Sequence, residues 1–151
     1  MQKLYHVFPR AISPDVCNQI IHRGLSTPSQ EASIGFDNDR VENSYRVSTL
    51  HWLYGPDNKD IVDLINQYST FANREYFGFD ISYGPHEFQF TEYHGNRQGK
   101  YDWHHDVWWT NPRPHDRKIT VSIQLSPRES YTGGDFEFRS PGDYKEMQGF
   151  A

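Results

Sequence analysis

Helical spacing of apolar residues marks two segments in the first half of the chain. In residues 14–25, apolar side chains recur every three or four positions, and Ser13 and Pro14 supply a capping residue and a proline that the first helical turn tolerates. From about Asn58, a second broad apolar face continues until Gly78. These two patterns predict two helices.

Apolar and polar residues alternate in the second half of the chain, which is typical of strands that bury one face. The alternation is clearest in residues 119–125, where Ile, Val, Ile and Leu are separated by polar residues. Gly133 and Gly134 predict a turn into a further short strand. The segments that we expect to be strands are residues 32–36, 46–53, 88–93, 119–125 and 135–138.

Helices followed by strands predict an α+β chain that is mainly β, with two helices packed on a sheet or a half-closed barrel. Its length of 151 residues fits one domain over residues 1–151. Only 35% of the residues are hydrophobic, but 16% are aromatic, so a core can be built from few large side chains.

Charge and cysteine content narrow the classes of partner and compartment. The net charge is −5, and no basic stripe runs along the chain, which argues against generic nucleic-acid binding. The single Cys17 cannot form an internal disulfide, which fits a reducing compartment. Because neither a signal-peptide pattern nor an apolar run of membrane-spanning length is present, we expect a cytoplasmic protein with no membrane partner.

The segment of residues 101–109 contains the side chains that are best able to bind a ligand or to take part in a reaction. If this segment is extended, Asp102, His104 and Asp106 lie on one face. An imidazole and a carboxylate on one face can bind one ion together, which is the beginning of the 2-His-1-carboxylate site of non-haem Fe(II). The pair alone is a weak signal in a chain with eight histidines, and a hydrolytic Zn(II) site with a third histidine is an alternative.

A series of short motifs runs in a specific order through nearly the whole chain. They are a capped helix within residues 7–25, Arg46-Val-Ser48 with Trp52-Leu53, the segment 88–93, Tyr101-x-x-His104-x-Asp106, the segment 120–125, and Gly-Gly-Asp-Phe-Glu-Phe at 133–138. Their order and spacing resemble the prolyl-4-hydroxylase-like branch of the 2-oxoglutarate- and Fe(II)-dependent dioxygenases.

This resemblance implies a double-stranded β-helix, or jelly roll, supported by the two N-terminal helices. It makes His104 and Asp106 the first two iron ligands and the catalytic residues, and it places Tyr93 in the 2-oxoglutarate pocket. Gln89 and Gln124 point toward the same interior by alternation and are weaker candidates for cofactor binding. The implied enzyme uses Fe(II), 2-oxoglutarate and O2, with ascorbate as a further candidate cofactor, to hydroxylate a small molecule or a prolyl or other protein side chain.

The chain departs from the family where a distal histidine and a later Arg or Lys should follow. After Asp106 the only histidine is His115, which lies in a proline-rich segment before the clearest predicted strand. We therefore expect an incomplete domain, a fragment that lacks the C-terminal strands. The alternatives are completion by another chain, a non-catalytic jelly-roll binding module, or a substitute third ligand, for which the candidates are His86, His94 and His115.

Several other side chains have both a functional and a structural interpretation. Arg40 and Arg46 could recognise a carboxylate, although Arg46 could equally hold a structural ion pair. The tryptophans near the histidine could form a substrate wall or belong to the core. These tryptophans are Trp103, Trp108 and Trp109.

Overall fold

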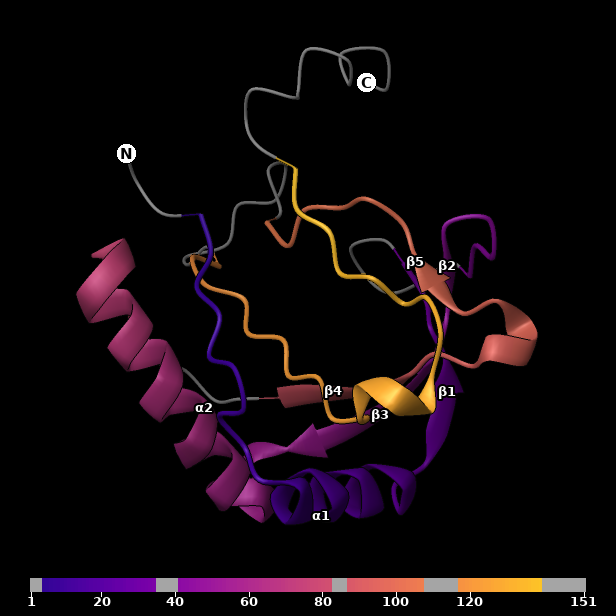
Figure 1. The fold of residues 1–151 in the computed structure, drawn as a ribbon, viewed down its shortest axis with the longest axis horizontal. Coiled ribbons are helices and arrows are strands. Elements are labelled where there is room, and N and C mark those ends of the chain that lie inside the picture. Colours follow the sequence, from indigo (N-terminus) through magenta and orange to yellow (C-terminus); the bar gives the residue numbers. More distant parts are fainter. Residues whose placement is uncertain (1–3, 35–40, 83–86, 108–116, 140–151) are drawn as a thin grey trace.

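The computed structural model describes residues 4–34, 41–82, 87–107 and 117–139 and shows helices combined with small antiparallel sheets (Figure 1). The α-helices in these ranges are α1, Pro14–Leu25, and α2, Lys59–Ala72. Both lie where the apolar spacing predicts helices, so the predicted combination of two helices with β-structure is confirmed. No helix in these four ranges has the length and apolar character that crossing a membrane requires.

The start of α1 follows from its capping residues. The Ser13 hydroxyl accepts a hydrogen bond from the Val16 amide at 3.4 Å, and Pro14 occupies the first turn, where its missing N–H costs nothing. Near the other end of α1, both terminal nitrogens of Arg23 donate to the Asp60 carboxylate at 2.7 Å. This bidentate pair joins α1 to the first turn of α2.

Helix α2 begins and ends at residues with specific backbone requirements. It follows a short 3-10 helix, η1, Gly55–Asn58, in which the buried Asn58 amide donates to the Tyr54 carbonyl at 2.9 Å. It continues into a π-helical turn, η2, Asn73–Phe77, and ends at Gly78, whose φ of 70° lies in the left-handed region that glycine adopts at low cost. The helical conformation thus extends to the glycine where the sequence predicts its end.

A three-stranded antiparallel sheet with the order β1-β3-β4 lies between the helices and the rest of the chain. Its strands are β1, Ser29–Glu31, β3, Thr49–Tyr54, and β4, Glu87–Glu92. In Figure 1, α1 runs beneath this sheet and α2 leans along one side of it. The core forms where the three meet, and it consists of Ile20 from α1, Leu53 from β3, Ile61 from α2 and Phe90 from β4.

A second, two-stranded sheet consists of β2, Arg46–Val47, and β5, Lys100–Tyr101. The extended segment predicted over residues 46–53 is therefore divided between two sheets. The division falls at Ser48, a buried residue whose carbonyl accepts a hydrogen bond from the Ala32 amide at 3.0 Å. As a result, Arg46 is paired in register with Tyr101 at the start of the histidine-containing segment.

Three strand predictions need correction. Residues 119–125 and 135–138 form no strand, and the strand expected at 32–36 lies instead at Ser29–Glu31, with Ile34 in an isolated bridge. A strand needs a hydrogen-bonded neighbour, and within the described ranges neither later segment has one. The alternation still predicts part of the burial, because Leu125 packs against the core whereas Val121 is exposed.

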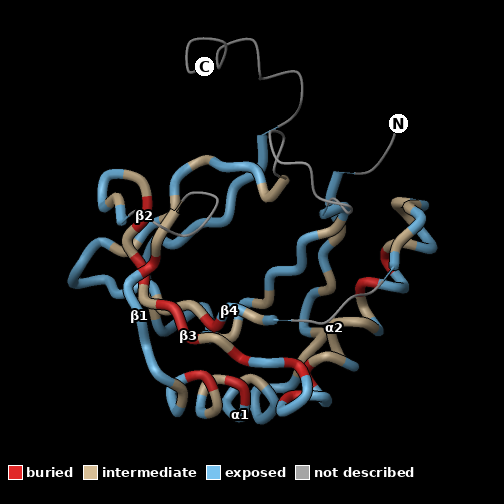
Figure 2. The backbone as a smooth tube through the Cα atoms, turned by 180° about the vertical axis from the view of Figure 1, so that it is seen from behind, coloured by how far each residue is buried: buried red, intermediate tan, exposed pale blue. Residues whose placement is uncertain are grey.

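The buried residues among those described all lie between Ile20 and Phe90. Figure 2 shows buried residues in α1, β3 and the start of α2, and a mostly exposed or half-buried trace for residues 117–139. Phe136 and Phe138 keep 71% and 55% of their surface exposed, although Phe138 stacks on Tyr5 with ring centroids 4.7 Å apart. Residues 117–139 thus bury little apolar surface.

Candidate metal-binding site

His104 lies in a loop that follows β5, and not on the extended strand that the alternation predicts. Its backbone bends at Trp103 and again at Asp106. The imidazole stacks on Tyr101 with centroids 3.6 Å apart and planes at 14°, and its Nδ1 lies 2.7 Å from the Asp102 carbonyl oxygen. Because a carbonyl only accepts, Nδ1 carries the proton, and in the neutral imidazole Nε2 therefore keeps the free lone pair.

The free nitrogen of His104 faces the carboxylate of Asp106. His104 Nε2 and Asp106 Oδ1 are 3.6 Å apart, which is longer than a hydrogen bond. Nitrogen and oxygen ligands that are each about 2.1 Å from one metal ion lie about 3.0 to 3.4 Å apart for right-angle to tetrahedral geometry. The pair therefore fits a shared ion after a movement of a few tenths of an ångström, and the Nδ1 contact orients the ring as an outer partner of a metal ligand does.

The third ligand is not identified in the described parts of the chain. Within these parts, no three His, Cys, Asp or Glu side chains are grouped so that they could hold a metal ion together. Of the substitute candidates, His94 is exposed and has its Nε2 3.7 Å from a Glu92 carboxylate oxygen. The other two, His86 and His115, lie outside the described residues. The site thus offers two protein donors with further coordination positions open.

Tyr45 holds the loop that contains the pair. Its phenol donates to the Trp103 carbonyl at 2.6 Å, and its own carbonyl accepts from the Asp102 amide at 2.9 Å. Burial raises the pKa of Tyr45, and the neighbouring Tyr101 and Asp102 raise it further. The phenol therefore stays protonated at neutral pH and remains a hydrogen-bond donor to the loop.

A buried guanidinium lies beside this loop. Arg46 is only 6% exposed, and its Cζ lies 4.3 Å from the centroid of the Tyr101 ring. Its Nε donates to the Ser48 hydroxyl at 3.2 Å, Nη1 to the Ser33 carbonyl at 3.4 Å, and Nη2 to the Gln89 amide oxygen at 3.4 Å. The three hydrogen bonds fix the plane of the guanidinium, but all three acceptors are neutral.

The positive charge of Arg46 acts on the pKa values of two neighbouring tyrosines, Tyr93 and Tyr101. Burial raises the pKa of Tyr93, although half of its surface remains exposed, and the charge and hydrogen bond of Arg46 oppose the rise. Burial also raises the pKa of Tyr101, with Arg46 opposing the rise and Asp106 adding to it. The structure thus brings Tyr93, a predicted co-substrate residue, together with Arg46, Tyr101 and the predicted ligand Asp106.

Other predicted site residues do not join this group. Gln124 is exposed, and its amide donates to the Ser126 carbonyl at 3.3 Å. The half-buried Trp103 has the guanidinium of Arg139 over its ring at 3.8 Å, so it is covered by a cation. The remaining predicted residues that lie outside the described ranges are Arg40, Trp108 and Trp109.

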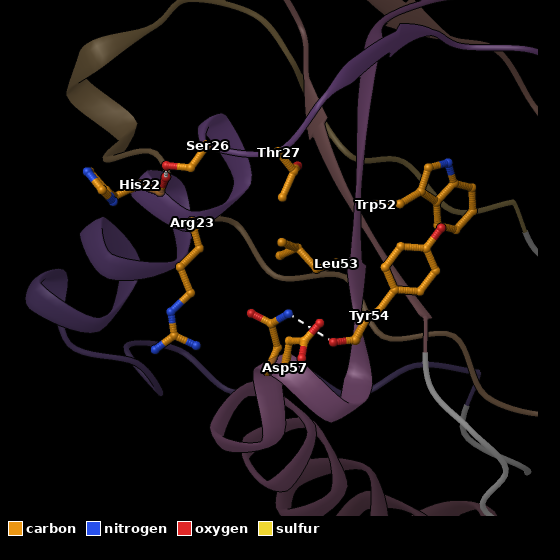
Figure 3. Close-up of a pocket in the computed structure, with 9 residues that line it drawn as sticks. His22, Arg23, Ser26, Thr27, Trp52, Leu53, Tyr54 and Asp57 are labelled. Carbon is orange, nitrogen blue, oxygen red and sulfur yellow. Dashed lines mark hydrogen bonds between the residues drawn. The ribbon is translucent and has the colours of Figure 1, made fainter.

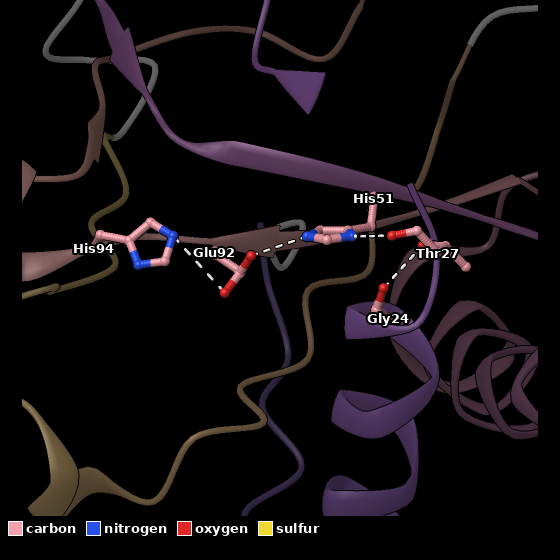
Figure 4. A network of polar contacts seen from close by, with 5 residues as sticks. All are labelled: Gly24, Thr27, His51, Glu92 and His94. Carbon is pink, nitrogen blue, oxygen red and sulfur yellow. Dashed lines mark hydrogen bonds and ion pairs between the residues drawn. The ribbon is translucent and has the colours of Figure 1, made fainter. Parts of the chain in front are cut away.

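A polar network that the sequence patterns do not indicate crosses the sheet (Figure 4). The buried His51 has Nδ1 3.0 Å from the Thr27 carbonyl and Nε2 2.9 Å from a Glu92 carboxylate oxygen. The Thr27 hydroxyl donates to the Gly24 carbonyl at 2.8 Å, and His94 lies beyond Glu92. Because Nδ1 must donate to a carbonyl, the second contact is a hydrogen bond only when His51 is an imidazolium or Glu92 is protonated.

A cavity of about 290 Å³ lies between the C-terminal end of α1, the end of β3, and η1 (Figure 3). His22 and Arg23 line one side, and Trp52 and Tyr54 line the other. Arg23 is already neutralised by Asp60 through two hydrogen bonds. This cavity shares no residue with the His104 loop.

Comparisons of the chain with protein-family models, with curated proteins and with solved structures find no match.

Proposed function

We propose that the chain is a 2-oxoglutarate- and Fe(II)-dependent oxygenase domain with His104 and Asp106 as iron ligands. The observation that carries the proposal is the orientation of His104. Its protonated Nδ1 is engaged by a backbone carbonyl at 2.7 Å, and its free Nε2 faces the Asp106 carboxylate at 3.6 Å. A neutral imidazole with an outer hydrogen bond, opposite a carboxylate, would supply one histidine and the carboxylate of a 2-His-1-carboxylate Fe(II) site.

The surroundings of the pair support the same function. Antiparallel sheets with two helices packed on one of them are the elements expected for part of a jelly roll. Tyr93, which the resemblance places in the co-substrate pocket, is electrostatically coupled to the same Arg46 that contacts Tyr101. Both phenols have raised pKa values because of burial, so both can donate hydrogen bonds to a carboxylate at neutral pH.

Each residue has a separate task in this proposal. His104 Nε2 and an Asp106 oxygen hold the metal, and the Asp102 carbonyl keeps the imidazole in the required tautomer. Tyr45 holds the loop backbone through its bond to the Trp103 carbonyl. Bound Fe(II) would supply the chemistry for hydroxylation of a substrate C–H bond, with O2 as the oxidant and 2-oxoglutarate as the co-substrate that leaves as succinate and CO2, and the protein supplies orientation and partial exclusion of water.

Metal titration of the whole chain tests the ligands directly. We expect His104→Ala and Asp106→Asn each to weaken Fe(II) or Mn(II) binding by more than about tenfold, since the first removes a ligand and the second removes the negative charge of the other ligand. His22→Ala, which removes an exposed histidine of α1, is the matched control and should leave the affinity unchanged. Equal metal affinity in wild type and His104→Ala would contradict the proposal.

Co-substrate binding separates the oxygenase from its alternatives. We expect 2-oxoglutarate to change the visible spectrum of the Co(II)-loaded protein. We expect the Fe(II)-loaded protein to convert 2-oxoglutarate into succinate and CO2 with O2 as the oxidant and ascorbate as the reductant. Zn(II) retained through purification, together with a Co(II) spectrum insensitive to 2-oxoglutarate, would favour a hydrolytic zinc site instead. A chain that binds none of these metals would favour the non-catalytic binding module.

A further inference from the structure

Arg46 has a buried positive charge without a carboxylate partner among the described residues. Arg46 is 6% exposed, and none of the ion pairs found within the described ranges involves its side chain. Buried arginines are normally paired with an acid, because taking an unpaired charge out of water is costly. The structural ion pair that the sequence allows for Arg46 is therefore not formed in this part of the chain.

The neighbours of Arg46 orient it but leave its charge uncompensated. A guanidinium has five N–H groups. The acceptors of Arg46 here are the Ser48 hydroxyl, the Ser33 carbonyl and the Gln89 amide oxygen, and the Ser33 and Gln89 bonds are long, at 3.4 Å. Because all of these acceptors are neutral and two bonds are weak, an anion can replace them at modest cost.

The position of Arg46 relates it to the proposed metal site. Its Cζ lies 4.3 Å from the Tyr101 centroid, and the His104 imidazole stacks on the same ring at 3.6 Å. Both groups therefore contact the same ring. The guanidinium and the imidazole are thus both neighbours of Tyr101, close enough for one small dicarboxylate to reach from the metal site to Arg46.

We propose that Arg46 anchors a carboxylate group of the small molecule that binds at the His104–Asp106 site, with Tyr93 beside it as a second donor. The planar guanidinium matches a carboxylate through two parallel N–H···O bonds. Asp106 also carries negative charge near Tyr101, but in the proposed function that charge is committed to the metal. The inference rests on the proposed function, and the carboxylate belongs either to 2-oxoglutarate or to the substrate.

Calorimetric titration of the whole metal-free chain with glutarate tests the anion site without the metal. Glutarate should bind wild type, and Arg46→Gln should raise its Kd at least about tenfold, since a charge-assisted bidentate pair is lost. Arg74→Gln, which removes an exposed arginine of η2, is the matched control and should bind glutarate like wild type. If circular dichroism shows that Arg46→Gln is unfolded, Arg46→Lys and Tyr93→Phe replace it. Glutarate affinity unchanged in the folded variants would overturn the proposal.

Two 2-oxo acids with the Mn(II)-loaded chain identify the source of the carboxylate. 2-Oxoglutarate and 2-oxopentanoate share the metal-chelating end and the chain length, but only the first has a distal carboxylate. If Arg46→Gln weakens 2-oxoglutarate alone, Arg46 anchors the co-substrate. If glutarate binding depends on Arg46 but both 2-oxo acids bind as in wild type, the carboxylate belongs to the substrate. If glutarate binding depends on Arg46 but the chain binds no metal, the proposed anion site stands and the proposed oxygenase function is refuted.

Discussion

Substitution of Gly24 by alanine is a sharp test of how α1 packs on the sheet. Gly24 is buried next to the last residue of α1, opposite Phe90 of β4. A Cβ atom at this position would lie 2.3 Å from Phe90 Cγ and 2.4 Å from its Cδ1. Non-bonded carbon atoms prefer about 3.5 to 4.0 Å, so either the ring or the helix must move by more than about 1 Å.

Two opposing terms set the size of the effect. Adding a methyl group to a packed core costs about 1–3 kcal/mol when neighbours must shift, and Phe90 is buried in the main core cluster. Alanine gains at most about 1 kcal/mol over glycine inside a helix, and less so close to the end at Leu25. We therefore expect Gly24→Ala to lower the free energy of unfolding by about 1–2 kcal/mol.

Urea unfolding followed by circular dichroism measures this change, provided that the m-value stays constant. Gly95→Ala is the matched control, because a Cβ at Gly95 meets no atom within 4 Å, and its effect should stay within about 0.5 kcal/mol. In a Phe90→Leu background, Gly24→Ala should cost less, which identifies the ring as the cause. Gly24→Ala as stable as wild type would refute the packing of α1 on β4.

Three further predictions concern hydrogen bonds and ion pairs elsewhere in the chain. Tyr45→Phe removes the hydrogen bond that holds the metal-site loop, so it should lower the free energy of unfolding in urea by about 1 kcal/mol and weaken Mn(II) binding several-fold. Unchanged metal affinity would contradict this role of Tyr45. His51→Gln should cost about 1–3 kcal/mol in urea unfolding, because it disturbs the buried bonds to Thr27 and Glu92, and a neutral result would show that the network is dispensable. Arg23 lowers the pKa of Asp60, so their pair contributes stability above the usual aspartate pKa and loses it as the pH falls through the lowered pKa. Because both side chains are substantially exposed, Arg23→Gln should cost less than about 1 kcal/mol in urea unfolding near pH 7, and a cost that persists in strong acid would exclude this pair as its source.

The helices and their ends follow from local sequence. Ser13 caps α1 through a side chain that reaches only one turn ahead, and Gly78 ends the second helical segment because its own backbone adopts a positive φ. Gly133 and Gly134 likewise take positive φ values where the sequence predicts a turn. These features depend on interactions within a few residues, so the residue pattern is sufficient to predict them.

The strands are predicted less completely, because each needs a partner from elsewhere in the chain. Residues 46–53 and 88–93 have the expected extended conformation, but only pairing shows that the first segment divides at Ser48 between two sheets. Residues 119–125 have the clearest alternation and yet form no strand, since alternation specifies which side is buried and does not supply a hydrogen-bonded neighbour. Pairing is a long-range property that a local pattern cannot determine.

The site shows the same division between local and tertiary information. Sequence spacing brings His104 and Asp106 together as a candidate pair, although a bent loop and the Tyr101 ring hold them instead of a strand. Neither the burial of Arg46 nor its contact with Tyr101 is visible in the spacing of residues, because both depend on the pairing of β2 with β5. The sequence alone thus determines which side chains can act as metal ligands. The charge environment around them arises only when distant segments fold together and exclude water.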